Sequence, residues 1–213
     1  MHELITEIIK RLKDWYKPQE WWKNVDYSPW EIMIAIALSS RTSYKQVIKC
    51  IERLRKSFRT PEDIINASDE RLAHVIKVVG FVKRRVIMLK KLAEMIVSVG
   101  GISNFLNLDT HTARKLLLSV PWIGPKTADM ILVALFGEKY FIVDSNILRV
   151  LKRLKVVPQN ADIYKAREII EPLIPKNERV FLHLALLHLG RTICKPKPKC
   201  EVCPLKNICK FST

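Results

Sequence analysis

Apolar residues recur every three or four positions along most of this chain, which is the period of an amphipathic α-helix. The stretches Val47 to Leu54 and Val86 to Ile96 show this spacing clearly. The pattern opens with a helix that ends near Tyr16 and carries on its apolar face Leu4, Ile5, Ile8, Ile9 and Leu12. Further helices are predicted over 112–118, 126–136, 146–154, 161–170 and 180–189.

Capping residues and glycines mark several helix boundaries. Ser28 can cap a helix that has Pro29 in its first turn and runs through Leu38. Thr60 and Ser68 are each followed by an acidic first turn, which predicts two more helix starts. Gly100-Gly101 is expected to end the helix that contains Val86 to Ile96.

One short segment, Phe141 to Val143, has the composition of a β-strand, but no alternating stretch is long enough to build a sheet around it. The sequence therefore predicts an all-α protein. No run approaches the ~20 apolar residues of a membrane span. Glu3, Glu7 and Asp14 interrupt any apolar core of a signal peptide, so we expect a cytoplasmic protein without a membrane partner.

The composition is strongly basic, with 37 Lys and Arg against 21 Asp and Glu and a formal net charge of +16 over 213 residues. Such an excess favours a polyanionic partner, because each neutralised phosphate releases condensed counterions. A solvated basic surface is the alternative interpretation. The hydrophobic fraction of 48% excludes an intrinsically disordered chain.

Four cysteines near the end of the chain follow a C-x5-C-x2-C-x5-C pattern: Cys194, Cys200, Cys203 and Cys209. Four thiols in so short a stretch, without a secretory signal, favour a metal site over disulfides. Zinc prefers two close pairs, and only Cys200 and Cys203 form one. Single thiolates flanking one pair suit a [4Fe–4S] cluster better, with zinc and disulfides as alternatives. The fifth cysteine, Cys50, is expected to be an inert core thiol.

The first loop between these cysteines is basic. Lys195, Lys197 and Lys199 alternate with Pro196 and Pro198, and proline restricts the loop to extended conformations that hold the ammonium groups outwards. We interpret the cluster as structural and the loop as a phosphate-binding surface. A merely solvated basic loop is the alternative.

The segment from Leu116 to Ala128 joins two apolar helices through the tight turn Pro121-Trp122-Ile123-Gly124. Gly124 allows close backbone approach, and the amides that open the following helix can bind a phosphate. Taken alone, the same residues also suit an ordinary helix–helix turn.

This hairpin resembles the helix-hairpin-helix of the endonuclease III superfamily of DNA glycosylases, whose loop usually reads Leu-Pro-Gly-Val-Gly-x-Lys-Thr-Ala. Downstream, Val143-Asp144-Ser145-Asn146 resembles the family's Val-Asp-x-His or Val-Asp-x-Asn segment, and the cysteines then follow as in its cluster loop. Upstream, Leu38-Ser39-Ser40-Arg41-Thr42 resembles its first DNA-contacting loop. The match spans nearly the whole chain. Trp122 replaces a glycine, Pro125 alters the hairpin, and the first cysteine interval is one residue shorter than usual.

The resemblance implies two all-α lobes. A six-helix barrel domain is expected over residues 25–137, with the helix-hairpin-helix over about 113–136. An iron–sulfur cluster domain is expected from residues 1–24 together with 138–213.

The resemblance also assigns the catalytic residues. Lys126 stands where bifunctional relatives carry a nucleophile, and a lysine amine can attack the sugar C1′ and form a Schiff base that permits β-elimination. Asp144 precedes a helix, so it can act as an N-cap, and the family role places its carboxylate beside the departing base. Without the resemblance, Lys126 would be interpreted as a surface lysine.

The DNA contacts implied by the resemblance come from three regions. Arg41 occupies the loop position where relatives place a residue that fills the gap left by a flipped nucleotide. A plain contact with a phosphate is the alternative role for Arg41. Asn146 is either a DNA contact or a neighbour of the cap. Arg84 and Arg85 are further candidates of the same kind. The remaining predicted DNA-binding residues are Trp122, Ile123, Gly124 and Thr127 of the hairpin and Lys195, Lys197 and Lys199 of the cysteine loop.

The resulting hypothesis is a base excision repair DNA glycosylase with AP lyase activity, acting as a monomer on duplex DNA and associated with the nucleoid. An oxidised pyrimidine is the favoured lesion. The tail motif and Asn146 also resemble mismatch-acting adenine or thymine glycosylases, which usually lack lysine at the hairpin position. The alternatives are a monofunctional mismatch- or alkylated-base glycosylase, in which water attacks, and a non-catalytic DNA-binding scaffold.

Overall fold

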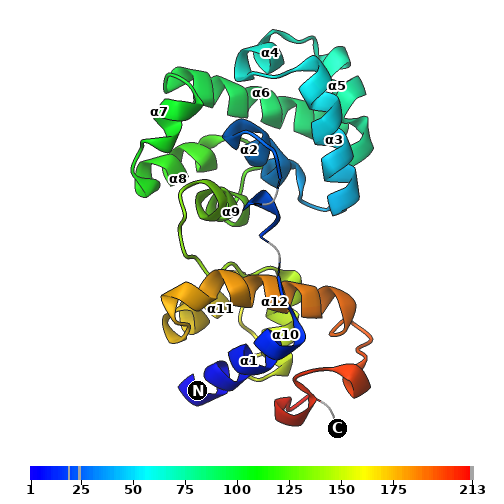
Figure 1. Cartoon of the computed structure of the whole chain (residues 1–213), viewed down its shortest axis with the longest axis vertical. Helices are drawn as coiled ribbons and strands as arrows, with labels where there is room; N and C mark the ends of the chain where they lie inside the picture. Colours follow the sequence, from blue (N-terminus) through cyan, green and yellow to red (C-terminus); the bar gives the residue numbers. More distant parts are fainter. Residues whose placement is uncertain (19, 24, 212–213) are drawn as a thin grey trace. The chain divides into compact units, whose positions relative to one another are not determined.

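The computed structural model describes residues 1–18, 20–23 and 25–211, and all regular secondary structure in these ranges is helical, which confirms the all-α prediction (Figure 1). The α-helices are α1 (His2–Trp15), α2 (Pro29–Leu38), α3 (Tyr44–Ser57), α4 (Pro61–Asn66), α5 (Asp69–Ile76), α6 (Val82–Ser98), α7 (Ile102–Leu106), α8 (Thr110–Ser119), α9 (Pro125–Leu135), α10 (Ser145–Arg153), α11 (Ile163–Ile170) and α12 (Arg179–Thr192). Short 3-10 turns lie at η1 (Trp21–Lys23), η2 (Lys77–Val79), η3 (Glu171–Leu173), η4 (Lys176–Glu178), η5 (Cys200–Val202) and η6 (Lys206–Ile208).

The chain separates into two compact units. The terminal unit combines Met1–Glu20 with the residues from Lys139 onward, and the central unit is Trp21–Glu138. The sequence-based boundaries fell at residues 24/25 and 137/138, and residue 24 lies outside the described residues. Each unit has its own apolar core.

The central unit is built around α2, which packs against α3 and α9 (Figure 1). Every residue of α2 from Ile32 to Leu38 is buried, and Trp30 is buried as well. A helix that is apolar on all sides belongs inside a core, so the other helices cover it. The helices α4 and α5 pack on α6, and α8 packs on α9.

The predicted caps form at the expected places. Ser28 accepts a hydrogen bond from the backbone N–H of Glu31, whose carboxylate accepts one from the N–H of Ser28, and this reciprocal pair starts α2. Thr60 and Asp63 form the same arrangement at α4. Ser68 caps α5 by accepting from the N–H of Arg71. These contacts satisfy donors that a helix start leaves open.

The terminal unit joins the first helix of the chain to the last. α12 packs against α10 and α1, and α10 also contacts α11. Ile5, Ile8 and Leu12 of α1 are buried in a core that α10, α11 and α12 complete. Tyr16 stacks on His188 of α12 with ring centroids 4.3 Å apart. The N-terminal helix is therefore part of the core formed by the C-terminal half.

Two helices differ most from the sequence-based expectation. α7 was not predicted, because five residues are too few to show a helical period. α11 begins at Ile163 rather than at residue 161, since Asp162 supplies the cap by accepting from the N–H of Lys165. The short segment with strand-like composition, residues 141–143, is buried and belongs to no strand, as the all-α prediction requires. Within the described ranges, no helix is long and apolar enough to cross a membrane.

Candidate active site

The hairpin between α8 and α9 is fixed by buried side chains on both sides of its turn. Val120 and Ile123 are each only 3% exposed. Arg114 of α8 donates to the carboxylate of Asp129 in α9 over 2.7 Å, and Asp129 is buried. The side chain predicted to contact DNA at Ile123 therefore lies in the core, so this residue has only its backbone to offer at the surface.

The start of α9 is open on the side of the turn. Gly124 is the N-cap, no side chain caps the helix, and a Cβ built on Gly124 would meet nothing within 4 Å. Pro125 occupies the first turn, and the first helical hydrogen bond runs from the N–H of Ala128 to the carbonyl of Gly124 at 3.0 Å. Open helix starts of this kind suit an anionic group. Lys126 in this first turn is exposed, and Thr127 is half-buried.

Asp144 is the N-cap of α10, as the sequence predicts. Its Oδ1 atom accepts hydrogen bonds from the backbone N–H groups of Asn146 and Ile147, each at 2.9 Å. The amide Nδ2 of Asn146 lies 3.4 Å from the second carboxylate oxygen. Asp144 is 7% exposed, so its carboxylate is held in one orientation inside the terminal unit. Asn146 is a neighbour of the cap in this structure.

The segment that leads into Asp144 is anchored by side chains far along the sequence. The backbone N–H of Phe141 donates to Glu171 at 2.9 Å. Nδ1 of His183, on α12, lies 2.7 Å from the carbonyl oxygen of Ile142. Since a carbonyl oxygen can only accept a hydrogen bond, Nδ1 carries a proton and is the donor. The buried chain from residue 141 to Asp144 is thus fixed from two elements that sequence analysis did not connect with the site.

α10 also holds the loop that carries the first cysteine. Arg149 donates to the carbonyl of Cys194 at 2.9 Å, to the carbonyl of Gly190 at 2.8 Å and to the side-chain oxygen of Asn146 at 3.1 Å. Arg153, one turn further along α10, donates to the carbonyls of Lys195 and Pro196. The helix that Asp144 caps is therefore hydrogen-bonded to the cysteine loop through Arg149 and Arg153.

The four predicted metal ligands line one small cavity. Cys194, Cys200, Cys203 and Cys209 are of intermediate burial, and Ile193, Pro198 and Phe211 also line the cavity. Burial raises the pKa of the Cys203 thiol, and charge on the other three thiols raises it further. Arg153 donates to the sulfur of Cys194 at 3.3 Å. Among the described residues, no three His, Cys, Asp or Glu side chains form a group that could hold a single metal ion.

These thiols fit an iron–sulfur cluster in their donor chemistry. Four mutually repelling thiolates in a half-buried cavity need positive charge between them, and each corner of a cluster accepts a separate thiolate. The loop lysines Lys195, Lys197 and Lys199 are all exposed, as the alternation with proline predicts.

The loop of Arg41 is held by a buried arginine that sequence analysis named as a further candidate for DNA contact. Arg85 is 6% exposed and donates to the carbonyls of Leu38 and Ser40, both at 2.7 Å, and to the hydroxyl of Thr42 at 2.8 Å. The suggestion that Arg85 contacts DNA is therefore wrong, because its guanidinium is used inside the protein. Arg41 itself is exposed and has a left-handed φ of +54°.

Phe81 is a candidate that sequence analysis missed. It is 55% exposed and has a φ of +48°, directly after Gly80 and before α6. The hydroxyl of Thr42 lies 3.2 Å from the carbonyl of Val79, so the turn that carries Phe81 is joined to the loop that carries Arg41. The signal available in the sequence was a glycine followed by an aromatic residue at a helix start without a polar cap.

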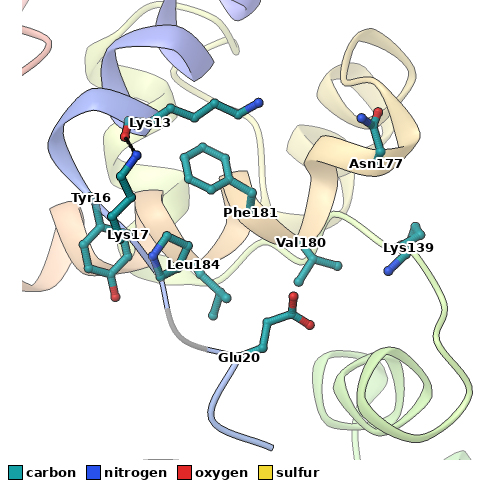
Figure 2. Close-up of a pocket in the computed structure, with 10 residues that line it drawn as sticks. Lys13, Tyr16, Lys17, Glu20, Lys139, Asn177, Val180, Phe181 and Leu184 are labelled. Carbon is teal, nitrogen blue, oxygen red and sulfur yellow. Dashed lines mark hydrogen bonds between the residues drawn. The ribbon is translucent and has the colours of Figure 1, made fainter. Parts of the chain in front are cut away.

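The terminal unit also has an open pocket of about 420 Å³ that none of the predicted site residues lines (Figure 2). Phe181, Val180 and Leu184 form its apolar part, and Lys17 and Lys139 lie on opposite sides of it. The ammonium group of Lys17 donates to the carbonyl of Lys13. We assign no role in the site to this pocket.

Comparison with known proteins relates this arrangement to DNA repair. The model of the HhH-GPD superfamily of base excision DNA repair proteins matches residues 34–176. A protein of Methanocaldococcus jannaschii named as a DNA repair glycosylase is 30% identical over 97% of this chain and 96% of its own length. Endonuclease III of Bacillus subtilis is 28% identical over 87% of this chain and 83% of its own.

Two solved structures have similar folds. A non-covalent endonuclease III–DNA complex superposes with a TM-score of 0.87 and 26% identity, covering 99% of this chain and 96% of the other. A thermostable thymine-DNA glycosylase superposes with a TM-score of 0.80 and 26% identity, covering 99% of this chain and 95% of the other.

Proposed function

We propose, from the premise that this chain belongs to the HhH-GPD superfamily of base excision DNA repair proteins, that it is a bifunctional glycosylase with AP lyase activity. The protein is a base excision repair DNA glycosylase of the endonuclease III family. The observation that carries the bifunctional proposal is an exposed lysine, Lys126, in the first turn of the hairpin helix α9.

In this proposal Lys126 is the nucleophile. Its amine attacks C1′ of the damaged nucleotide, the glycosidic bond breaks, and the base departs with the bonding electron pair and takes up a proton. The amine adduct opens the sugar to a Schiff base, and loss of a C2′ proton then expels the 3′ phosphate. A residue without an amine at this position would leave the attack to water.

Asp144 stabilises the positive charge that develops at C1′ in the proposed mechanism. Asp144 is 7% exposed, and its carboxylate is fixed by two backbone N–H groups, so it does not need to reorient during the reaction. The same hydrogen bonds make it a cap, and a carboxylate that caps a helix is held more rigidly than one on a loop.

Duplex DNA is the proposed partner, and the open start of α9 is the proposed phosphate site. Lys195, Lys197 and Lys199 add a second basic surface, and Arg41 and Phe81 add two exposed side chains on adjoining loops. A base must leave the stack before it can react, and side chains of this kind can fill the vacancy.

We propose that the four cysteines hold a [4Fe–4S] cluster with a structural role. When bound, the cluster cross-links the loop from Cys194 to Cys209. Arg149 and Arg153 tie that loop to α10, so the cluster would also brace the helix that Asp144 caps. In this scheme the terminal unit is the cluster domain, and the central unit, which contains α2 to α9, is the barrel domain with the hairpin.

The favoured lesion is an oxidised pyrimidine, in keeping with the similarity to endonuclease III. The second candidate is a monofunctional mismatch- or alkylated-base glycosylase, and the similarity in fold to a thymine-DNA glycosylase is the observation that favours it. Lys126 is the residue that argues for the bifunctional enzyme. A non-catalytic scaffold would have no need of both Lys126 and Asp144.

A panel of lesion duplexes, treated with and without borohydride, tests the proposal. Wild-type protein should become covalently joined to oxidised-pyrimidine DNA, because borohydride reduces the Schiff base. Lys126→Gln should lose trapping and keep DNA binding, and Asp144→Asn should cut base excision by about 10²-fold or more. Undiminished excision by Lys126→Gln would instead assign the water-attack mechanism, and activity that survives both changes would overturn the proposal.

A further inference from the structure

The hairpin turn places a large side chain at a backbone position that favours glycine. The N–H of Ile123 donates to the carbonyl of Val120 at 3.1 Å and closes a four-residue turn, with Pro121 second and Trp122 third. The φ of Trp122 is +63°. Proline followed by a positive φ is typical of a type II turn, in which glycine or asparagine normally takes the third place. A Cβ at this position is strained.

Packing within the protein does not compensate for this strain. Trp122 is 52% exposed, whereas Val120 and Ile123 on either side of the turn are buried and attach it to the core. Within the part of the chain that the structure describes, Trp122 takes part in no ring pair and no cation–π contact. A glycine would form the same turn at lower free energy. Strain that brings no packing in return is a feature of functional positions.

The surroundings of Trp122 point to a nucleic-acid ligand. It stands two residues before Gly124, whose open backbone starts α9, and four before Lys126. A phosphate held at this helix start would bring its own nucleotide next to the turn. An exposed indole offers a broad apolar face and one N–H donor, which suits a nucleotide ring better than a phosphate.

We infer that Trp122 is a DNA-contacting residue whose indole lies flat against a nucleotide ring, base or deoxyribose, beside the phosphate at the start of α9. This inference rests on the proposed DNA binding by the hairpin. Contacts from lysines and backbone amides are electrostatic and weaken with salt, whereas ring stacking does not release counterions. Trp122 therefore contributes binding free energy that does not depend on salt, in an interface whose other contacts are electrostatic.

Replacing Trp122 by glycine separates the two roles of this position. W122G should raise the midpoint of thermal unfolding, because it removes the left-handed Cβ. The same variant should bind undamaged duplex about 10-fold more weakly, the loss expected for one aromatic stack. The slope of log Kd against log salt should stay at the wild-type value. W122F, which keeps a ring, should bind within about 3-fold of wild type.

Two controls and one substitute variant make the result specific. Lys155 is exposed and also left-handed, with a φ of +56°, so K155G should show the gain in stability without the salt-independent loss of affinity. Tyr164 is 65% exposed on α11, and Y164A should leave affinity unchanged if an exposed ring alone is not sufficient. W122N provides a second glycine-like variant in case W122G fails to fold.

A duplex with consecutive abasic sites distinguishes the two rings. Equal binding of W122G and wild type to abasic DNA assigns the contact to a base, and a persistent difference assigns it to the sugar. Wild-type affinity of W122G and W122N for intact duplex would overturn the inference, as would a reduced salt slope in either variant. The affinity measurements use undamaged duplex, and the abasic sites are tetrahydrofuran analogues, which have no C1′ aldehyde for an amine to attack. Both are therefore independent of the excision and trapping assays, so the inference and the proposed enzyme activity can fail separately.

Discussion

Gly190 of α12 lies directly against Asn146 of α10. A Cβ built on Gly190 would be 3.0 Å from both the Cβ and the carbonyl oxygen of Asn146 and 3.2 Å from its carbonyl carbon. α10 and α12 can therefore approach this closely only because Gly190 has no side chain. The contact lies at the helix start that Asp144 caps, so the spacing of these two helices also sets the position of the proposed catalytic carboxylate.

Gly190→Ala should destabilise the protein although it lies within a helix. In an exposed helix interior the change would add about 1 kcal/mol of stability. Here the methyl group meets backbone atoms of Asn146 that have no rotamer to change, and overpacking of this kind costs about 1–3 kcal/mol. Urea unfolding should therefore show a lower midpoint, and base excision should fall. Thr192→Ala, at the exposed last residue of α12, serves as the control. A Gly190→Ala variant more stable than wild type would contradict the tight contact.

The three loop lysines should act through the DNA backbone. Changing Lys195, Lys197 and Lys199 together to alanine should weaken binding to unrelated duplexes and flatten the log–log salt dependence by up to ~3. A control with the same charge change replaces three exposed lysines elsewhere in the terminal unit: Lys10, Lys165 and Lys176. If both triple variants flatten the slope equally, the effect belongs to the net charge of the protein and not to the cysteine loop.

Arg85 and Arg84 should differ sharply when each is replaced by methionine. Arg85→Met removes the donor of three hydrogen bonds to the loop of Arg41, and the acceptor that loses its donor in the interior is the carbonyl of Leu38. The expected cost is about 2–4 kcal/mol. Arg84 is exposed, and its replacement should change stability by less than about 0.5 kcal/mol. Denaturant titration of both variants measures the contrast. Equal losses would show that the buried guanidinium is not what holds the loop.

Cys50 should resist alkylation in the native protein. Burial raises the pKa of its thiol to about 12, so almost no thiolate is present at neutral pH. Its contribution to stability is fully present below the ordinary pKa of a cysteine, and it should be lost as pH rises from there towards about 12. Mass spectrometry after iodoacetamide treatment should find Cys50 unmodified until the chain is unfolded, and the alkaline loss of stability should be smaller in Cys50→Ala. Modification of native protein at pH 7 would contradict the burial.

The four remaining cysteines should bind iron with acid-labile sulfide, about four atoms of each per chain. Anaerobically prepared protein should be brown, and Cys203→Ser should lose the colour and weaken binding by the loop lysines. Stoichiometric zinc without iron in such a preparation would assign the cysteines to the alternative metal site.

The sequence by itself determined the features that depend on neighbouring residues. Helical periods, the caps at Ser28 and Thr60, and the end of α6 before Gly100 all follow from contacts within a few positions along the chain. The cap at Asp144 and the family motifs could be recognised for the same reason, because each is defined by residues only a few positions apart in the sequence. The all-α class could therefore be predicted with no knowledge of the packing.

Only the tertiary structure decided how chemically equivalent residues divide between core and surface. Arg84 and Arg85 are identical neighbours, yet one is exposed and the other is buried beneath a loop more than forty positions earlier in the chain. Glu171 and His183 anchor the approach to Asp144 by contacts that span 30 and 41 positions along the chain. The left-handed backbone of Trp122 depends on the burial of Val120 and Ile123 around it. Such contacts cost loop-closure entropy and form only when the whole core forms, so no local pattern of residues encodes them.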